Sequence, residues 1–287
     1  SVTALPGEKD KANNAGALWV NATTQRPKVL LLDGRPRWEY RYLRNLFERD
    51  DRWEVNSLLA GAGGEQRTWV RGKLPGQFPA DRETLYTYNL IVFGDVPANQ
   101  LRTNELEWVR DFVGHRGGGV IFIDGRQERL ASLAASALAP LFPVSFEGKP
   151  LDGAPLNFQI QATGSSLSPL LLTSDAAENA QLWWFLPAPH WLAGVRAQPG
   201  AETWLAAATG ETRSPALVFR RYGAGKSLYL AFDETWRWRY KVGDRYHQKF
   251  WHQTARFVME SAFAVQDKFV ALDSGALHYE PGATAEI

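Results

Sequence analysis

Short runs of apolar residues recur along the chain, with turn-forming residues beside them. Runs of this length, rich in valine, isoleucine, leucine and phenylalanine, are typical of strands that are buried on both faces of a sheet. The runs lie at positions 28–33, 53–59, 90–93, 120–124 and 227–232. We therefore predict a central sheet that is built mainly from parallel strands.

Between several of these runs the apolar residues recur at a spacing of three to four, which predicts amphipathic helices. In the first such segment Leu43 and Phe47, for example, lie on one helix face. The predicted helices lie at 38–48, 104–115, 129–138 and from 244 to about 258. Strands that alternate with helices indicate an α/β protein with a doubly wound, mostly parallel sheet.

The remaining segments suggest three regions. Residues 1–25 resemble the end of a preceding β-sandwich or are a tail, 26–264 form the α/β domain, and 265–287 are the start of a following β-sandwich or a tail. Within the domain, 140–200 reads as irregular, with an edge strand pair at 151–162. A Gly turn at 223–225 predicts a hairpin that ends in the last apolar run.

Composition narrows the classes of function. The chain has 287 residues and a formal charge of +1, so no strong overall field favours nucleic acid or an anionic membrane. It has no cysteine, which excludes a thiol nucleophile and any disulfide in these residues. No apolar stretch approaches the roughly 20 residues of a membrane span. We expect no membrane span, no nucleic-acid partner, no metal and no cofactor.

Two clusters of arginine, tryptophan and acidic residues follow the first and the last apolar run. Ligands of open α/β sheets bind beyond the carboxyl ends of the strands, so these side chains are candidates for a binding rim. The candidate residues are Arg37, Trp38, Glu39, Arg41, Asp124, Arg126, Asp233, Glu234, Trp236, Arg237, Trp238, Arg239, Tyr246 and His247. They predict either a pocket for a sugar or an anionic small ligand, or a network of internal ion pairs that holds the loops.

The core also resembles a known family. Four of its segments carry the resemblance: VLLLDGRPRWEYRYLRNLFERD at 29–50, IVFGDVP at 91–97, LEWVRDFVGHRGGGVIFIDG at 106–125 and RRYGAGKSLYLAFDETWRWRYKVGDRYHQKFW at 220–251. These segments are similar to class I glutamine amidotransferase-like domains of bacterial envelope proteins. The resemblance implies a flavodoxin-like sheet. It also implies an extracytoplasmic, periplasmic-side setting within a membrane-anchored protein, often beside immunoglobulin-like and von Willebrand factor A-type domains.

The catalytic residues of that family do not transfer to this chain. Active members carry a nucleophilic cysteine on a sharp turn after a strand, and the corresponding turn here is Asp124-Gly125-Arg126. They also carry a histidine after a late strand, where this chain has Asp233-Glu234-Thr235. Acyl transfer needs both a nucleophile and a base, so we predict no catalytic residues.

The sequence thus predicts a non-catalytic module that binds other envelope domains, other proteins or a ligand. The alternative is a carbohydrate-binding or hydrolytic domain that resembles the trehalose-utilisation branch of the same fold. That alternative predicts an open cleft lined by Trp38, Trp236, Trp238 and acidic residues.

Overall fold

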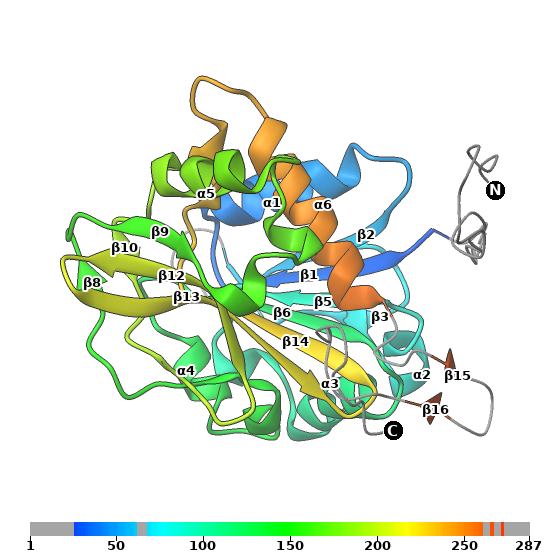
Figure 1. Ribbon diagram of the computed structural model, residues 1–287. Helices are drawn as coiled ribbons and strands as arrows, with labels where there is room; N and C mark the ends of the chain where they lie inside the picture. Colours follow the sequence, from blue (N-terminus) through cyan, green and yellow to red (C-terminus); the bar gives the residue numbers. More distant parts are fainter. Residues whose placement is uncertain (1–25, 62–67, 261–264, 267–270, 273–287) are drawn as a thin grey trace, which may run out of the picture.

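The computed structural model describes residues 26–61, 68–260, 265–266 and 271–272. An eight-stranded sheet with the order β2-β1-β5-β6-β14-β13-β12-β9 crosses its centre (Figure 1). The strands are β1 (Lys28–Asp33), β2 (Glu54–Leu59), β5 (Leu90–Phe93), β6 (Gly119–Ile123), β9 (Asn157–Ile160), β12 (Glu202–Thr209), β13 (Thr212–Tyr222) and β14 (Gly225–Leu230). The five predicted apolar runs all lie in this sheet.

Strand direction changes within the sheet. The five strands from β2 to β14 are parallel to one another, whereas β13, β12 and β9 continue the sheet by antiparallel pairing. β1, β5 and β6 are almost completely buried, which explains their continuous apolar sequences. The prediction of an α/β protein with a mostly parallel central sheet is therefore confirmed.

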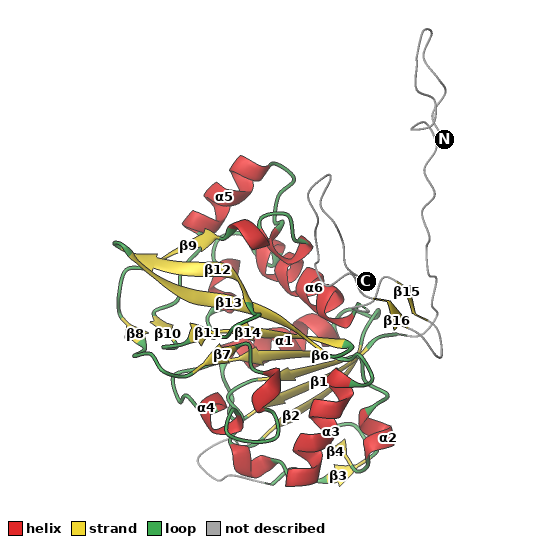
Figure 2. Ribbon diagram, turned by 60° about the horizontal axis from the view of Figure 1, so that its bottom comes forward, coloured by secondary structure: helices red, strands yellow, loops and turns green. Residues whose placement is uncertain are grey.

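Helices cover both faces of the parallel strands (Figures 1 and 2). α1 (Trp38–Glu48) and α6 (Arg245–Met259) lie on one face, and α3 (Thr103–Gly114) lies on the other. A Cβ atom on Gly118 would lie 2.1 Å from Phe112 of α3, and one on Gly119 would lie 2.6 Å from Val258 of α6. Neighbouring strand residues point to opposite faces, so these two glycines let both helices pack closely on β6.

Short elements fill the connections. The helices are α2 (Arg82–Leu85), α4 (Leu130–Leu133) and α5 (Ala176–Phe185), with 3₁₀ turns η2 (Ala98–Gln100), η3 (Ala139–Leu141), η4 (Ala162–Gly164), η5 (Ser168–Leu170) and η6 (Thr235–Arg239). The two-residue strands pair as β3 (Arg71–Gly72) with β4 (Phe78–Pro79), β7 (Val144–Ser145) with β11 (Arg196–Ala197), and β8 (Leu151–Asp152) with β10 (Trp191–Leu192).

Two local predictions are wrong. The segment 140–200 contains helix α5, which begins where the Asp175 carboxylate accepts a hydrogen bond of 2.8 Å from the Glu178 backbone N–H. The apolar residues of α5 are concentrated in its last turn and form no stripe, so the pattern does not reveal the helix. The expected strand pair at 151–162 also differs, because β8 pairs with β10 while β9 is the edge strand beside β12.

The predicted helix at 129–138 is shorter than expected. Regular helix covers only Leu130–Leu133. The hydroxyls of Ser132 and Ser136 each donate a 2.6 Å hydrogen bond to a carbonyl three residues earlier. Such side-chain hydrogen bonds compete with the hydrogen bonds of a regular helix, and turns replace the second half of the predicted helix.

The predictions for the chain ends fall almost entirely outside the described residues. This applies to 1–25 and to most of 265–287, of which β15 (Val265–Gln266) and β16 (Ala271–Leu272) form an antiparallel pair. Among the helices that the structure describes, none has both the length and the apolar character needed to cross a bilayer.

Candidate functional site

Four aspartates lie at the carboxyl ends of neighbouring parallel strands. Asp33 ends β1, Asp95 and Asp124 follow β5 and β6, and Asp233 follows β14. We call this region the carboxyl edge; open α/β sheets bind their ligands beyond this edge. In the described part of the chain, no three acidic or histidine side chains are arranged to hold a metal ion. Arginines pair with three of these acids, Asp33, Asp95 and Asp233.

The Arg37 guanidinium connects three of the parallel strands at the carboxyl edge. Its Nε donates to Oδ2 of Asp33 at 2.7 Å, and its Nη1 donates to Oδ2 of Asp233 at 3.0 Å. It also donates to the backbone carbonyls of Ile123 and Asp124, both at 3.1 Å. The guanidinium therefore crosslinks the ends of β1, β6 and β14.

Burial makes this network strong. The side chains of Arg37, Asp33 and Asp233 are 6%, 2% and 14% exposed. Although burial alone would lower the pKa of Arg37, the carboxylates of Asp33 and Asp233 raise it above its usual value. The guanidinium is therefore permanently charged, and it neutralises acids that water reaches poorly.

Glycines make room for the guanidinium. A Cβ atom on Gly94 would lie 2.5 Å from Nη2 of Arg37 and 2.1 Å from Oδ2 of Asp33. A Cβ atom on Gly125 would lie 3.0 Å from Nη1 of Arg37 and 3.1 Å from Oδ2 of Asp233. A side chain at Gly94 has to displace the network, and one at Gly125 would press against it, so the protein's own groups fill this part of the carboxyl edge.

Asp124 occupies the turn where the resemblance places a nucleophile, and it is fully buried. The Tyr229 hydroxyl donates to one of its oxygens, and the Gly125 backbone N–H donates to the other at 2.9 Å. Burial raises the pKa of Asp124 to about 7, although the hydrogen bond from Tyr229 opposes the shift. Asp124 thus lies beneath the surface and is held by Tyr229, a contact that the sequence does not reveal.

Glu39 joins the first helix to the loop after β14. Its carboxylate accepts hydrogen bonds from the backbone N–H of Thr235 at 2.8 Å and from the Thr235 hydroxyl, which in turn accepts one from Trp251 Nε1 at 2.9 Å. Burial raises the pKa of Glu39 to about 7, against the hydrogen bond from Thr235. Glu39 ties α1, η6 and α6 together and is inaccessible to a ligand.

The loop before β10 is fixed to η6 by Glu234 and Arg237. The Glu234 carboxylate accepts from His190 Nδ1 at 2.9 Å and from Arg237 Nη1 at 3.0 Å, while Arg237 also donates to the Ala188 carbonyl at 2.6 Å. His190 itself is largely exposed. The pairing of His190 with Glu234 joins residues 44 positions apart, and sequence spacing gives no sign of it.

Trp238 is part of the core and does not face solvent. It is 1% exposed, and its ring packs edge-on against Trp183 and Phe250 at centroid distances of 5.4 and 5.1 Å. Its indole N–H donates to the Pro187 carbonyl at 3.1 Å. The cleft lined by three tryptophans that the carbohydrate alternative predicts therefore lacks one of its walls.

Trp38, Tyr42 and Trp236 form an aromatic group at the surface, with ring centroids 5.9–6.4 Å apart. Trp38 is 51% exposed. The guanidinium of Arg41 lies 5.2 Å from the Trp38 ring, and that of Arg239 lies 4.0 Å from the Tyr42 ring. These cation–π contacts place positive charge beside the exposed aromatic rings.

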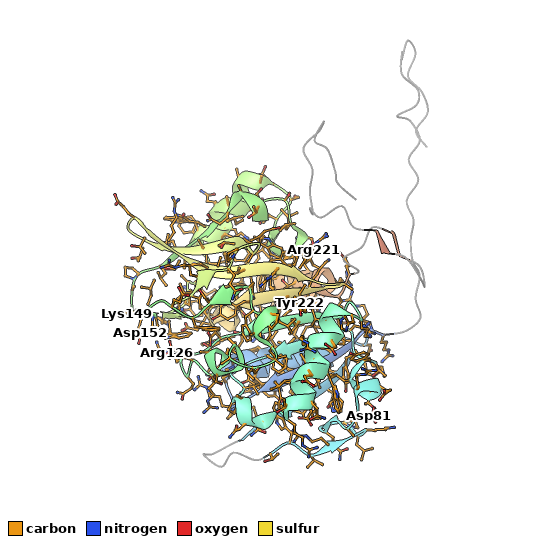
Figure 3. The ribbon with its side chains drawn as sticks, turned by 90° about the horizontal axis from the view of Figure 1, so that it is seen from below. Asp81, Arg126, Lys149, Asp152, Arg221 and Tyr222 are labelled. Atoms are coloured by element: carbon orange, nitrogen blue, oxygen red, sulfur yellow. The ribbon has the colours of Figure 1, made fainter. Side chains whose placement is uncertain are left out.

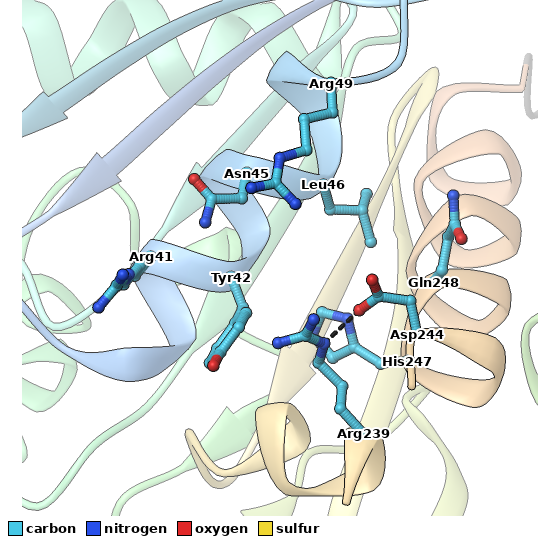
Figure 4. A pocket seen from close by; sticks show the side chains of 9 residues that line it. All are labelled: Arg41, Tyr42, Asn45, Leu46, Arg49, Arg239, Asp244, His247 and Gln248. Carbon is cyan, nitrogen blue, oxygen red and sulfur yellow. Dashed lines mark hydrogen bonds and ion pairs between the residues drawn. The ribbon is translucent and has the colours of Figure 1, made fainter. Parts of the chain in front are cut away.

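A pocket of about 250 Å³ lies between α1, η6 and the start of α6 (Figure 4). Arg41, Tyr42 and Arg49 come from the α1 side, and Arg239 and His247 come from the opposite side. We call it the α1–α6 pocket. Three of the predicted rim residues line it, while Arg49 and Tyr42 join it without having been among the candidates.

The two other candidate residues lie elsewhere. Arg126 is exposed and forms a bidentate ion pair with Asp152 of β8, at 2.8 and 2.9 Å (Figure 3). Tyr246 is half-buried, and the guanidinium of Arg245 lies 5.3 Å from its ring. Neither residue joins the carboxyl edge network or the lining of the α1–α6 pocket.

Comparisons with known proteins add little to this picture. No protein-family model matches the chain, and no curated protein is significantly similar to it. One similar solved structure is an exo-beta-1,4-mannosidase from Opitutaceae bacterium strain TAV5, with 13% identity and a TM-score of 0.42. The match covers 82% of this chain and 36% of the mannosidase chain. A likeness this distant carries no argument about function.

Proposed function

We propose that this chain is a non-catalytic, glutamine amidotransferase-like module of a bacterial envelope protein, which binds a protein or a ligand. The parallel strands follow the order β2-β1-β5-β6-β14, which corresponds to the 2-1-3-4-5 order of flavodoxin-like sheets. This order, together with helices on both faces, supports the doubly wound architecture that the sequence resemblance implies.

One observation carries the non-catalytic part of the proposal. The guanidinium of Arg37 fills the carboxyl edge at the turn where an amidotransferase holds its nucleophile, and it neutralises Asp33 and Asp233. Asp124 is the residue at that turn, but it is buried against Tyr229. With no cysteine in the chain, the arrangement supports a role in holding the strand ends together.

The envelope setting is part of the same proposal. It rests on the sequence resemblance and on the absence of cysteine, which suits an oxidising compartment. In such a protein the partners would be neighbouring envelope domains or proteins. The exposed rings of Trp38 and Tyr240, at 51% and 72%, are suited to such contacts.

A carbohydrate-binding role is the second candidate. The observation that favours it is the surface group of Trp38, Tyr42 and Trp236, because flat aromatic rings stack on the apolar faces of sugars. The burial of Trp238 and the filled carboxyl edge favour binding at the surface over hydrolysis in a deep cleft.

Glutamine hydrolysis tests the non-catalytic part directly. We expect concentrated wild-type protein to release ammonia from glutamine no faster than the Asp124→Asn and Asp233→Asn variants do, because neither acid is free to attack an amide. The measurement is ammonia production over hours with each protein at equal concentration. Turnover by the wild type that disappears in either variant would overturn the proposal.

A further inference from the structure

The α1–α6 pocket carries net positive charge. Three arginines, Arg41, Arg49 and Arg239, line it together with one carboxylate, that of Asp244. Asp244 is already paired with Arg239. Within the described residues, Arg41 and Arg49 form no ion pair with a carboxylate. The Arg49 guanidinium is therefore available to an anion, whereas the Arg41 guanidinium lies over the Trp38 ring and points away from Arg239 and His247 (Figure 4).

The start of helix α6 adds to this field. Asp244 precedes the helix, but its carboxylate is paired with Arg239 and makes no capping hydrogen bond to the helix. The first backbone N–H groups of a helix lack partners within it and carry partial positive charge. The electrostatics of α6 thus favour negative charge at the same end of the pocket.

His247 gives an independent indication of a ligand. It lies in the first turn of α6, lines the pocket, and is 1% exposed. Its Nε2 is buried without a hydrogen-bond partner among the described residues. Buried polar atoms are almost always paired, so an unpaired one in a pocket wall calls for an explanation.

The imidazole of His247 is neutral at physiological pH. Burial lowers its pKa to about 3, and the neighbouring Arg239 acts in the same direction, while Asp244 opposes them. A neutral imidazole carries one hydrogen-bond donor and no charge, so the positive charge of the pocket comes from its arginines. Nothing in the pocket then requires a change of protonation when an anion enters.

We propose that the α1–α6 pocket binds a tetrahedral oxyanion, the phosphate or sulfate group of a small ligand. Arg49 supplies the positive charge beside the start of α6, His247 lies in the pocket wall, and Tyr42 lies beside the ligand with its ring stacked on Trp236. A volume of about 250 Å³ accommodates such a group with a small attached moiety. The inference rests on the ligand-binding part of the proposed function and specifies the class of ligand.

Calorimetry with inorganic phosphate, sulfate and acetate tests this assignment. We expect phosphate or sulfate to bind saturably to the wild-type protein, with a Kd of about 1 mM or tighter, and acetate to bind more weakly. Glucose 6-phosphate and glucose form a second pair of probes. Binding of the phosphate ester but not of glucose supports the proposal, whereas equal binding of both sugars would assign the site to the carbohydrate itself.

Two variants of the same helix surface make a matched pair. Arg49→Gln removes a charge from the pocket and is expected to weaken phosphate binding about fivefold. Arg44→Gln removes another exposed charge, which pairs with Glu48 outside the pocket lining, and it is expected to change binding less than about twofold. Equal losses in both variants would indicate diffuse attraction and contradict a defined site.

A readout at His247 does not depend on a substitution in the core. Adding phosphate to the wild-type protein is expected to shift the imidazole nitrogen resonances of His247 and to leave those of the distant His115 unchanged. Saturable phosphate binding without a response at His247 would overturn the assignment, as would the absence of saturable binding. A negative result here leaves the glutamine test untouched, so the two failures are distinguishable.

Discussion

Replacing Arg37 with methionine is expected to lower the free energy of unfolding by about 3–5 kcal/mol, because it leaves buried charges without a partner. Asp33 and Asp233 lose their shared guanidinium, and the carbonyls of Ile123 and Asp124 lose a donor. The methionine side chain is similar in length to the aliphatic part of arginine. The substitution therefore removes the charge and the hydrogen bonds but keeps most of the packing volume. Urea unfolding at neutral pH measures the loss.

Two further variants separate this effect from a general loss of charge. Arg44→Gln removes an exposed arginine of the same helix and is expected to cost less than about 1 kcal/mol. Arg37→Lys retains the charge, but an ammonium group cannot reproduce the fork that reaches two acids and two carbonyls. We expect Arg37→Lys to recover only part of the stability. A loss for Arg37→Met as small as that for Arg44→Gln would contradict the network.

Stability is expected to depend on pH through Asp124. Its pKa is about 7 in the folded protein and has a usual value of 3.8, so the folded state binds the proton more tightly. The contribution is fully present below pH 3.8 and is lost as the pH rises through about 7. Between pH 5 and pH 8 the stability of the wild type relative to Asp124→Asn should fall by about 3 kcal/mol.

The comparison with Asp124→Asn isolates this acid from the other buried groups. Glu39 titrates in the same direction, whereas the buried His247, with its lowered pKa, destabilises the folded state as the pH falls. Both contributions are present in wild type and variant, and they cancel in the difference. A stability difference that stays constant from pH 5 to pH 8 would mean that Asp124 is ionised at neutral pH.

The strands and main helices of the α/β core were predictable because their sequences obey local rules. β1 and β5 are continuous apolar runs buried on both faces, and α1 has a clear amphipathic pattern. Helix α5 was missed because its aromatic residues pack at one end, where Trp183 enters the core. Local periodicity therefore predicts elements with one uniform buried face and fails for those that are buried at one end.

The sequence predicted where the candidate site lies in the fold, but only some of the residues that form it. Arg37, Asp124 and Asp233 do meet at the carboxyl edge, because strands of one direction bring their ends together. Asp33 and Asp95 were missed, although each lies directly beside a glycine, a pattern that Asp124-Gly125 repeats. Gly94 and Gly125 leave space for the guanidinium, whereas Gly34 leaves space for the Asp95 carbonyl.

Burial was the property that the sequence did not determine. Trp236 and Trp238 are two residues apart in one polar loop, yet Trp236 joins the surface aromatic group and Trp238 is enclosed by Trp183 and Phe250. A 3₁₀ turn points these side chains in different directions, and only the packing of distant segments decides which of them is covered. The same reason separates the buried Glu39 from the exposed Trp38.

The central claim is that the groups at the carboxyl edge bind one another and thereby hold the strands together. A double-mutant cycle of Arg37→Met and Asp233→Asn, followed by urea unfolding, measures that interaction most directly. We predict that the losses in free energy of unfolding caused by the two single substitutions are far from additive, with a coupling free energy of at least about 1.5 kcal/mol. The reason is that each single substitution leaves the charge of the other residue buried without its partner. Additivity to within about 0.5 kcal/mol would contradict the account.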